Sequence, residues 1–342
     1  RSAGSEPGPA CYGTGLELTV TDANLLLGRL DPDYFLGGRM PLDVERAREV
    51  AASLAARLDM DPMTLAHGVV RVANANMERA IRVVSVQRGF DTRDFALVAF
   101  GGAGGMHACE IADTLDIATV IVPRHAGVLS ALGMLLTDVT KDYSQSVLRP
   151  AAEIDDAWLE QRFAALEAKA AGDLAAEGFE GERARIERAL DLRYVGQSYE
   201  ITVSGREGFR GEFDRRHLQL YGYANPGRAA EVVNLRVKAV GLTAKPALPR
   251  APRLADGLPA PLRVRHTWFG GRRHDTPVYH VEDLQAGAAG RGPALLAGAQ
   301  ATAVVPPHYG FHIDAFGNVV ATRAVSPRAR RAPRRVAVGA GA

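Results

Sequence analysis

The hydrophobic positions of this chain follow a helical period in one long segment and form a continuous run in the next. Between residues 62 and 88 the apolar residues recur every three or four positions, which predicts an amphipathic helix. Asp61 and Pro62 suit the N-cap and the first helical position, and Gly89 suits the stop. Residues 95–100 are apolar without interruption, which predicts a strand buried on both faces.

Four glycines within residues 101–105 follow this predicted strand and precede a helix-compatible run over residues 106–115. A second predicted strand, residues 118–123, completes a βαβ unit. A strand that turns through glycines into a helix leaves bare backbone N–H groups, where an anion or a nucleotide can bind. We therefore predict nucleotide binding at Gly101, Gly102, Ala103 and Gly104, with a tight structural turn as the alternative.

The turn does not fit the two best-known glycine codes. His107 stands where the dinucleotide fingerprint needs its third glycine, and Pro123-Arg124 ends the next strand where an acid is expected. A P-loop needs Gly-Lys-Ser/Thr, and no lysine of the chain follows a glycine loop. The turn therefore predicts neither a dehydrogenase nor a P-loop enzyme.

Several polar residues near the βαβ unit are candidate site residues. Asn74 and Asn76 lie among the apolar positions of the long helix, and buried amides need partners, either a ligand or the backbone of a loop. Both asparagines are candidate nucleotide-binding residues, and the loop backbone stays open as their partner. Arg124 and His125 follow the second strand, at the sheet edge where open α/β proteins bind ligands. His107 and His125 are the candidate catalytic residues, and a structural role stays open for His125.

The remaining patterns divide the chain into parts. Residues 1–145 form the α/β part, and residues 146–245 read as helix, strands, helix and strand, which is typical of a small α+β unit. Within it, residues 230–241 alternate as a strand. Five prolines follow between 246 and 261 and indicate a linker. Short strands then make residues 246–325 a β-rich module, and the arginine-rich residues 326–342 are expected to be a disordered basic tail.

Composition and charge exclude several classes of protein. The 342 residues are 47% hydrophobic and 23% charged, with a net charge of +2, which gives no case for nucleic acid binding. The chain has no apolar run of 18 residues, so we predict no segment that spans a membrane. Cys11 and Cys109 form neither a disulfide framework nor a metal-binding spacing, so we predict no metal ligands and a cytoplasmic setting. Cys11 is a candidate nucleophile, with a neutral thiol in a tight turn as the plainer interpretation.

A series of ordered motifs resembles the hydantoinase A/5-oxoprolinase family. The match runs through nearly the whole chain and covers roughly the C-terminal half of the usual A-type subunit. Because the chain also starts at Arg1 in a Gly/Pro-rich loop, we expect an N-terminal half to be missing. The motifs are Gly8-Pro-Ala-Cys-Tyr-Gly13, Thr19-Val-Thr-Asp-Ala-Asn24, Leu36-Gly-Gly-Arg-Met40, Asn74-Ala-Asn-Met77, Phe100-Gly-Gly-Ala-Gly104, Val122-Pro-Arg-His-Ala-Gly127, Leu192-Arg-Tyr-Val-Gly-Gln-Ser-Tyr-Glu200, Thr276-Pro-Val-Tyr279 and Val304-Val-Pro-Pro307.

The resemblance implies the C-terminal part of an actin-like, ribonuclease-H-like ATPase lobe in residues 1–145. It implies an ATP- and Mg²⁺-dependent hydrolase that opens cyclic amides of the hydantoin, N-methylhydantoin or 5-oxoproline type by phosphorylating the amide oxygen. The glycine turn, Gly101 to Gly105, would then hold the adenosine side of ATP. The expected partners are a hydantoinase B-type subunit and a small cyclic amide, with no nucleic acid and no membrane.

Other functions stay open. One is a subunit of an ATP-dependent acetone/acetophenone-type carboxylase, another is a non-catalytic assembly fragment, and a third is a generic α/β ligand-binding protein. The chain also departs from the family pattern, which commonly has Pro-Leu where Gly105-Met106 precede His107. It also often has acids where Ala297-Gly298-Ala299-Gln300 stand. The first departure loosens the turn, and the second puts the assembly or substrate role of the last module in question.

Overall fold

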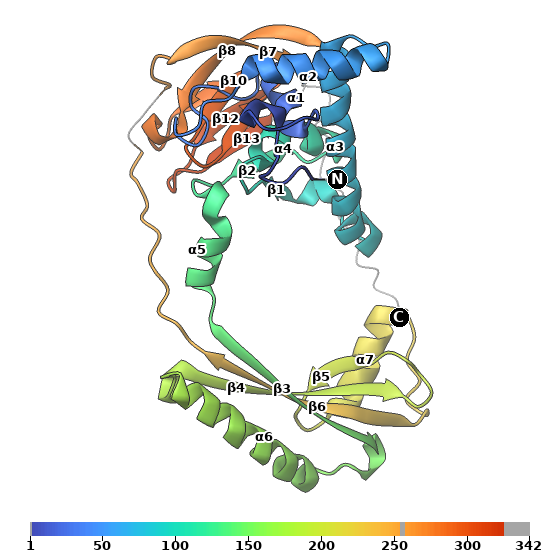
Figure 1. The fold of residues 1–342 in the computed structure, drawn as a ribbon. Helices are drawn as coiled ribbons and strands as arrows, with labels where there is room; N and C mark the ends of the chain where they lie inside the picture. The colour runs from blue at the N-terminus through green and yellow to red at the C-terminus, as the bar shows by residue number, and fades with distance from the viewer. Residues whose placement is uncertain (1, 254–256, 325–342) are drawn as a thin grey trace. The chain divides into compact units, whose positions relative to one another are not determined.

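The computed structural model describes residues 2–253 and 257–324, which divide into two compact units (Figure 1). Unit 1 contains the described residues up to Leu132 and from Leu248 onward, and unit 2 is Gly133–Ala247. Each unit has a hydrophobic core of its own. Within the described residues, no helix has both the length and the apolar character needed to cross a bilayer.

Unit 1 begins with three helices, α1 (Val20–Leu26), α2 (Val44–Arg57) and α3 (Pro62–Val84). Thr19, Asp43 and Asp61 are their N-caps, and each side chain accepts a backbone N–H of the first turn. The predicted start of α3 is confirmed, but the helix ends at Val84 rather than at residue 88. A 3₁₀ turn, η2 (Val86–Arg88), follows it, and the chain reverses at Gly89 with φ +83°.

The predicted βαβ unit is present as β1 (Ala96–Val98), α4 (Gly104–Thr114) and β2 (Thr119–Val122), with the two strands parallel. The prediction that its first strand is buried on both faces is wrong. β1 has three residues and lies at the edge of a five-stranded sheet with the order β1-β2-β13-β12-β9. Val98 is 47% exposed. An apolar run does not distinguish an edge strand from a central one, because periodicity carries no information about strand order.

Strands from the far end of the chain complete this sheet. β13 (Val319–Arg323) pairs antiparallel with β2, followed by β12 (Tyr309–Ile313) and β9 (Ala289–Arg291). We expected residues 246–325 to be a separate β-rich module, but β13 shares a sheet with β2, and the described residues from Leu248 onward belong to unit 1. Local patterns miss this pairing because its partners are almost 200 residues apart. The expected tail, residues 326–342, lies outside the described residues.

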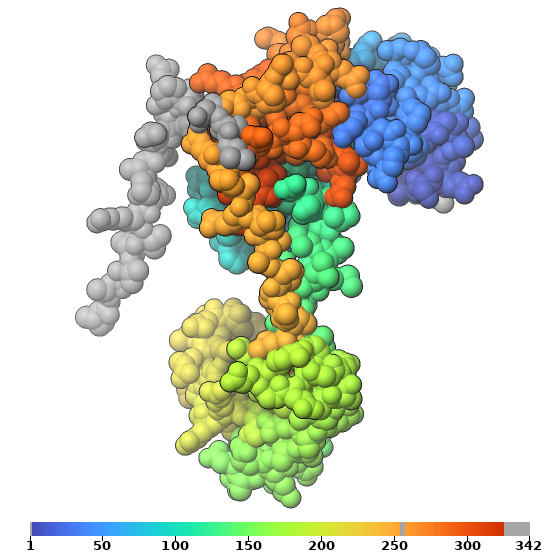
Figure 2. All heavy atoms as spheres, turned by 90° about the vertical axis from the view of Figure 1, so that its left-hand side faces the viewer, coloured from blue at the N-terminus to red at the C-terminus, as the bar shows by residue number. Residues whose placement is uncertain are grey.

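A second sheet of unit 1 has the order β11-β10-β8-β7. It is formed by β7 (Arg263–Phe269), β8 (Arg272–His280), β10 (Ala294–Ala297) and β11 (Thr302–Val305). Cys11 and Leu25 from the start of the chain share one buried cluster with Phe269 and Leu295 of this sheet. The N-terminal segments, blue in Figure 2, accordingly lie against the orange and red C-terminal strands.

Unit 2 is a four-stranded antiparallel sheet with two helices packed on it, and α5 (Leu129–Leu136) leads into it along the chain. The strand order is β3-β6-β4-β5, with β6 at residues Ala230–Gly241, as the alternating pattern predicts. The other elements are β3 (Val139–Pro150), α6 (Asp156–Ala176), β4 (Ala184–Tyr194), β5 (Ile201–Ser204) and α7 (Phe209–Tyr221).

One buried carboxylate joins three strands of unit 2. Asp191 on β4 is 2% exposed and accepts hydrogen bonds from Arg236 Nε at 2.5 Å, Thr202 Oγ1 at 2.7 Å and Asn234 Nδ2 at 3.0 Å. Burial acts to raise the pKa of Asp191, but these hydrogen bonds, with that of Arg236 foremost, outweigh it and hold the pKa below its usual value. The charged form of Asp191 therefore stabilises the folded sheet.

Candidate functional site

The glycine turn links the end of β1 to the start of α4. Gly101 has a φ of +82°, a left-handed conformation that favours glycine, and its N–H donates to the carbonyl of Ala126 at 2.7 Å. Gly102 and Ala103 are exposed, and α4 begins at Gly104 with no side chain capping its first turn. The N–H of Met106 donates to the carbonyl of Ala103 at 3.0 Å, so the positive end of the α4 dipole and the N–H groups that precede Met106 are left for a ligand.

Glycines at and beside the turn let β11 and the segment that precedes it come close. A Cβ on Gly105 would lie 2.6 Å from the carbonyl oxygen of Thr302, closer than side chains tolerate. A Cβ on Gly127 would lie 2.7 Å from the carbonyl oxygen of Gln300, and one on Gly102 would lie 3.3 Å from the same atom. The start of β11 and the residue Gln300 before it therefore pack directly against this region, and only a residue without a side chain fits at Gly105.

A cavity of about 190 Å³ borders the turn at Gly102 and Ala103. Three aromatic residues, Tyr12, Tyr34 and Phe35, contribute to its wall. Pockets that hold a whole drug-sized ligand measure roughly 300–1,000 Å³, so this cavity suits one ring of a larger ligand. A planar base could contact aromatic faces there while its attached groups extend toward the bare backbone of the turn.

Tyr34 is held in place beside this cavity. Its ring stacks on the imidazole of His280, with 3.6 Å between the ring centroids. Burial, followed by the charges of Glu282 and Asp283, raises the pKa of Tyr34. The phenol therefore stays protonated at neutral pH and can donate a hydrogen bond.

A second cavity, of about 450 Å³, shares the segment from Gly298 to Ala301 with the first. Arg124 and His125 line it, both exposed and just beyond the end of β2, as the sequence predicts for that edge of the sheet. Glu282 also lines it, and its carboxylate accepts the N–H of Ala299 at 2.7 Å. This cavity has the size of a small-molecule site.

His107 does not reach either cavity. It lies on α4 with 4% exposure, its Nδ1 2.7 Å from Asn74 Oδ1 and its Nε2 3.4 Å from Asn24 Nδ2. Since the Asn74 oxygen can only accept, we assign the ring proton to Nδ1 and leave Nε2 to accept from Asn24. Burial, followed by the charge of Arg29, lowers the pKa of His107, with Glu110 acting in the opposite direction. A neutral ring with both nitrogens engaged positions α4 rather than transferring protons.

The hydrogen-bond network around His107 continues to a buried ion pair. Asn74 Nδ2 donates to Glu110 Oε2 at 2.7 Å, and Glu110 Oε1 pairs with Arg29. The side chain of Arg29 is 1% exposed and that of Glu110 is 32% exposed. Arg29 lies just beyond α1, Asn74 on α3 and Glu110 on α4, so the network joins three segments of unit 1.

The structure separates the predicted site residues into groups. Gly101, Gly102, Ala103 and Gly104 form one continuous turn, whereas Asn74 pairs with His107 and His125 lines the second cavity. Asn76 is exposed and, two residues from Asn74, points to the other side of α3. Sequence reasoning missed Asn24, Arg29 and Glu110. A signal was available, because His107 and Glu110 are three residues apart on the predicted helix and so share one of its faces.

Cys11 does not have the environment of a nucleophile. It is 1% exposed, and its backbone N–H donates to the buried carboxylate of Asp22 at 2.8 Å, alongside the N–H of Ala10 at 3.1 Å. Burial foremost, and then Asp22, raises the pKa of the Cys11 thiol far above its usual range. The thiol stays neutral, which fits the tight-turn interpretation and not the nucleophile.

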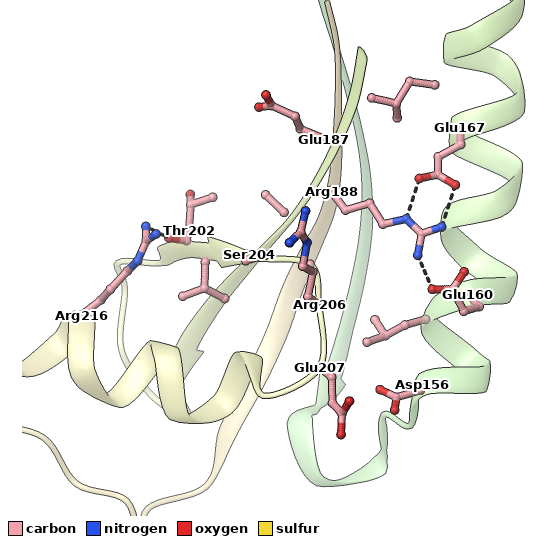
Figure 3. Close-up of a pocket in the computed structure, with 15 residues that line it drawn as sticks. Asp156, Glu160, Glu167, Glu187, Arg188, Thr202, Ser204, Arg206, Glu207 and Arg216 are labelled. Carbon is pink, nitrogen blue, oxygen red and sulfur yellow. Dashed lines mark hydrogen bonds and ion pairs between the residues drawn. The ribbon is translucent and has the colours of Figure 1, made fainter. Parts of the chain in front are cut away.

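Unit 2 carries an open polar cavity of about 820 Å³ between α6 and the edge of the sheet (Figure 3). Arg188 points toward α6, where it binds both carboxylate oxygens of Glu167, at 2.5 and 2.7 Å, and also pairs with Glu160. Arg216 donates to the carbonyl of Thr202 at 2.7 Å. Arg188 thus pairs with Glu160 and Glu167, and Arg216 pairs with Glu212 at 2.7 Å, so we assign no reaction to this cavity.

Metal ligation is the remaining chemistry to consider. Among residues 2–253 and 257–324, no group of three or more His, Cys, Asp or Glu side chains is placed to hold a metal ion. The site defined by the structure is therefore an α/β glycine turn with two adjoining cavities.

Comparison with known families places the chain among its relatives. The family model described as Hydantoinase/oxoprolinase matches residues 1–143, and the model described as Hydantoinase/oxoprolinase C-terminal domain matches residues 144–319. The chain belongs to the hydantoinase/oxoprolinase family. The two matches together span residues 1–319 of the chain.

Three relatives illustrate the range of the family. Caprolactamase subunit alpha of Pseudomonas jessenii is 34% identical over 92% of this chain and 48% of its own length. 5-Oxoprolinase 1 of Arabidopsis thaliana is 35% identical over 93% of this chain and 27% of its own length. Acetophenone carboxylase gamma subunit of Aromatoleum aromaticum is 32% identical over 93% of this chain and 46% of its own length.

A solved structure gives the same picture. The crystal structure of ATP-dependent caprolactamase from Pseudomonas jessenii matches with a TM-score of 0.78 and 32% identity, over 95% of this chain and 50% of that chain. The mixed α/β fold with several sheets is therefore shared with that protein. The chain spans about half, or less, of the length of the curated relatives it matches.

Proposed function

We propose that this chain is part of an ATP-dependent cyclic-amide hydrolase with an actin-like ATPase lobe. The observation that carries the proposal is the uncapped glycine turn at the start of α4, which opens beside an aromatic-walled cavity. The names of two relatives, 5-oxoprolinase 1 and ATP-dependent caprolactamase, support ATP use and a cyclic amide substrate.

The residues of the turn fit the adenosine part of ATP. The absence of side chains at Gly101, Gly102 and Gly104 allows a base or a ribose to approach the backbone, and nothing lies within 4 Å of a Cβ built on Gly101. Tyr34 offers a protonated phenol and an aromatic face. When bound, ATP would supply the phosphoryl group that activates the amide oxygen, with Mg²⁺ as its usual partner. We assign no metal ligand, since the described residues contain no suitable cluster.

The other predicted residues take different roles in this proposal. Asn74 and His107 are positioning residues that fix α4, and through α4 the turn, because His107 is buried and hydrogen-bonded. His125 is the better candidate for contact with substrate, since it is exposed and lines the cavity of about 450 Å³. Asn76 has no part in the site. We propose a B-type subunit as partner, because two relatives are themselves named subunits, alpha and gamma.

A carboxylase subunit is the second candidate, and the acetophenone carboxylase relative favours it. The experiment that separates the two uses the natural polypeptide containing this chain together with its partner subunit. ATP-dependent ring opening of 5-oxoproline, hydantoin or caprolactam without bicarbonate would support the hydrolase. ATP turnover that needs a ketone and bicarbonate would support the carboxylase. ATP turnover with neither class of substrate would contradict both.

A further inference from the structure

A third pocket of unit 1 lies on the other end of the His107 network. It measures about 390 Å³ and is bordered by α3, α4, the segment after α1 and the turn between β7 and β8. Its walls include Arg29, His67, Arg71, Asn74 and Glu110. It shares no lining residue with the two cavities beside the glycine turn.

Arg29 enters this pocket with most of its hydrogen-bonding capacity unused. Only its Nη2 is engaged, with Glu110 Oε1 and, at 3.5 Å, with the carbonyl of Trp268. Its Nε and Nη1 are buried and have no hydrogen-bond partner, and the whole side chain is only 1% exposed. The ring of Phe269, centred 5.8 Å from Cζ, offers only a weak contact. Buried guanidinium N–H groups without acceptors are unfavourable, so an acceptor is missing here.

Two further side chains at this pocket carry nitrogens without a partner. The Nε2 of His67 is buried without a partner, and Arg71, one turn further along α3, is exposed. Within the part of the chain that the structure describes, Arg71 forms no ion pair or hydrogen bond. Three nitrogen-bearing side chains thus border one pocket, and the buried Nε and Nη1 of Arg29 and Nε2 of His67 have no hydrogen-bond partner there.

The acids that face the pocket do not meet this need. Both carboxylate oxygens of Glu110 are occupied, one by Arg29 and the other by Asn74. Glu78 is paired with Nε of Arg82 at 2.7 Å. After these pairs are counted, the positive charge of Arg71 and the free N–H groups of Arg29 are uncompensated.

We propose that this pocket binds a small oxoanion, the phosphate or carboxylate group of a ligand, between Arg29, His67 and Arg71. A planar guanidinium presents parallel N–H groups that match two oxygens of such an anion. The anion would complete the hydrogen bonding of Arg29 and neutralise Arg71. Because Asn74 and Glu110 belong to both the pocket and the His107 network, occupancy here is linked to the position of α4.

The test follows His67 by NMR in the full chain while inorganic phosphate is added, with acetate in a parallel titration. The imidazole signal is assigned by its loss in His67→Gln. Burial, followed by the charge of Arg29, lowers the pKa of His67, and Arg71 contributes in the same direction. A bound anion opposes these charges, so the pKa of His67 should rise and the rise should saturate. Saturation with phosphate alone identifies a phosphate site, and saturation with acetate identifies a carboxylate site.

Two exposed arginines of α3 make a matched pair of variants. Arg71→Gln removes one charge from the pocket and should weaken anion binding about tenfold or more, as expected for a charge-assisted hydrogen bond. Arg79→Gln removes a charge that is also exposed but does not border the pocket, and it should leave binding unchanged. The proposal is overturned if neither anion shifts His67 in the folded protein, or if the two variants weaken binding equally.

Discussion

Replacing Gly105 with alanine should destabilise unit 1 even though alanine is the better helix former. The added Cβ would lie 2.6 Å from the carbonyl oxygen of Thr302 and 3.1 Å from Cα of Ala303. Ordinary contact needs about 3.5 Å, so α4 and β11 would have to separate by roughly 0.9 Å. Overpacking of this kind costs about 1–3 kcal/mol, and the helix propensity of alanine offsets up to about 1 kcal/mol of it. We expect a net loss of about 1–2 kcal/mol.

Gly68→Ala is the matched control, because Gly68 also lies within a helix of unit 1 and nothing is within 4 Å of its Cβ position. It should stabilise unit 1 by up to about 1 kcal/mol. The chain has two tryptophans, Trp158 in unit 2 and Trp268 in unit 1. In a Trp158→Phe background, urea unfolding followed by the fluorescence of Trp268 therefore reports on unit 1 alone.

Opposite signs for the two glycine variants are the expected result. If Gly105→Ala is as stabilising as Gly68→Ala, the close approach of β11 to the turn does not exist in solution. An equal loss in both variants would mean that glycine is needed for the flexibility of the helices, and not for this contact.

Three further predictions concern buried charges and thiols. Glu110→Gln should destabilise unit 1 by about 3 kcal/mol, since it leaves buried Arg29 without a counter-charge. Glu78→Gln should cost under about 0.5 kcal/mol. Similar losses of stability in the two variants, measured by unfolding followed with Trp268 fluorescence, would refute this prediction. Cys11 and Cys109 should resist a thiol-specific reagent in the native protein at pH 8 and react on unfolding, because burial raises the pKa of both thiols; fast native labelling would contradict it. The lowered pKa of Asp191 contributes stability above the unfolded value of about 3.9, and this contribution is lost as the pH falls through the folded value. Unit 2, whose unfolding is followed by the fluorescence of Trp158, should therefore lose stability below about pH 4. The Asp191→Asn variant should have a less stable unit 2 at pH 7, and its stability should depend less on acid pH. If the variant has the same pH profile of stability as the original protein, this role of Asp191 is excluded.

Local signals in the sequence predicted individual elements well. Asp61-Pro62 marks the start of α3, and the alternation of residues 230–241 gives the bounds of β6, because capping and period-two patterns are local properties. The glycine turn was found for the same reason. The hydantoinase/oxoprolinase family followed from ordered motifs, which the family models match over residues 1–319.

Features that depend on distant contacts were not predictable from these patterns. The pairing of β13 with β2 joins segments far apart in the chain and makes the last strands part of unit 1. Residues 95–100 are apolar, yet β1 is an exposed edge. The place of His107 beside the turn suggested a catalytic role. In the structure both of its ring nitrogens are hydrogen-bonded, to Asn74 and Asn24 on other helices.

The most direct test of the nucleotide site is a calorimetric titration of the natural polypeptide containing this chain with Mg-ATP. A Cβ on Gly102 would already lie 3.3 Å from the carbonyl oxygen of Gln300, so Gly102→Val should displace the turn, with Gly102→Ala as the milder change. Micromolar binding that weakens at Gly102→Ala, is lost at Gly102→Val and persists in Gly68→Ala is the result we predict. A folded protein that releases no heat with Mg-ATP, or that binds it equally well in all three variants, would contradict a nucleotide site at the glycine turn.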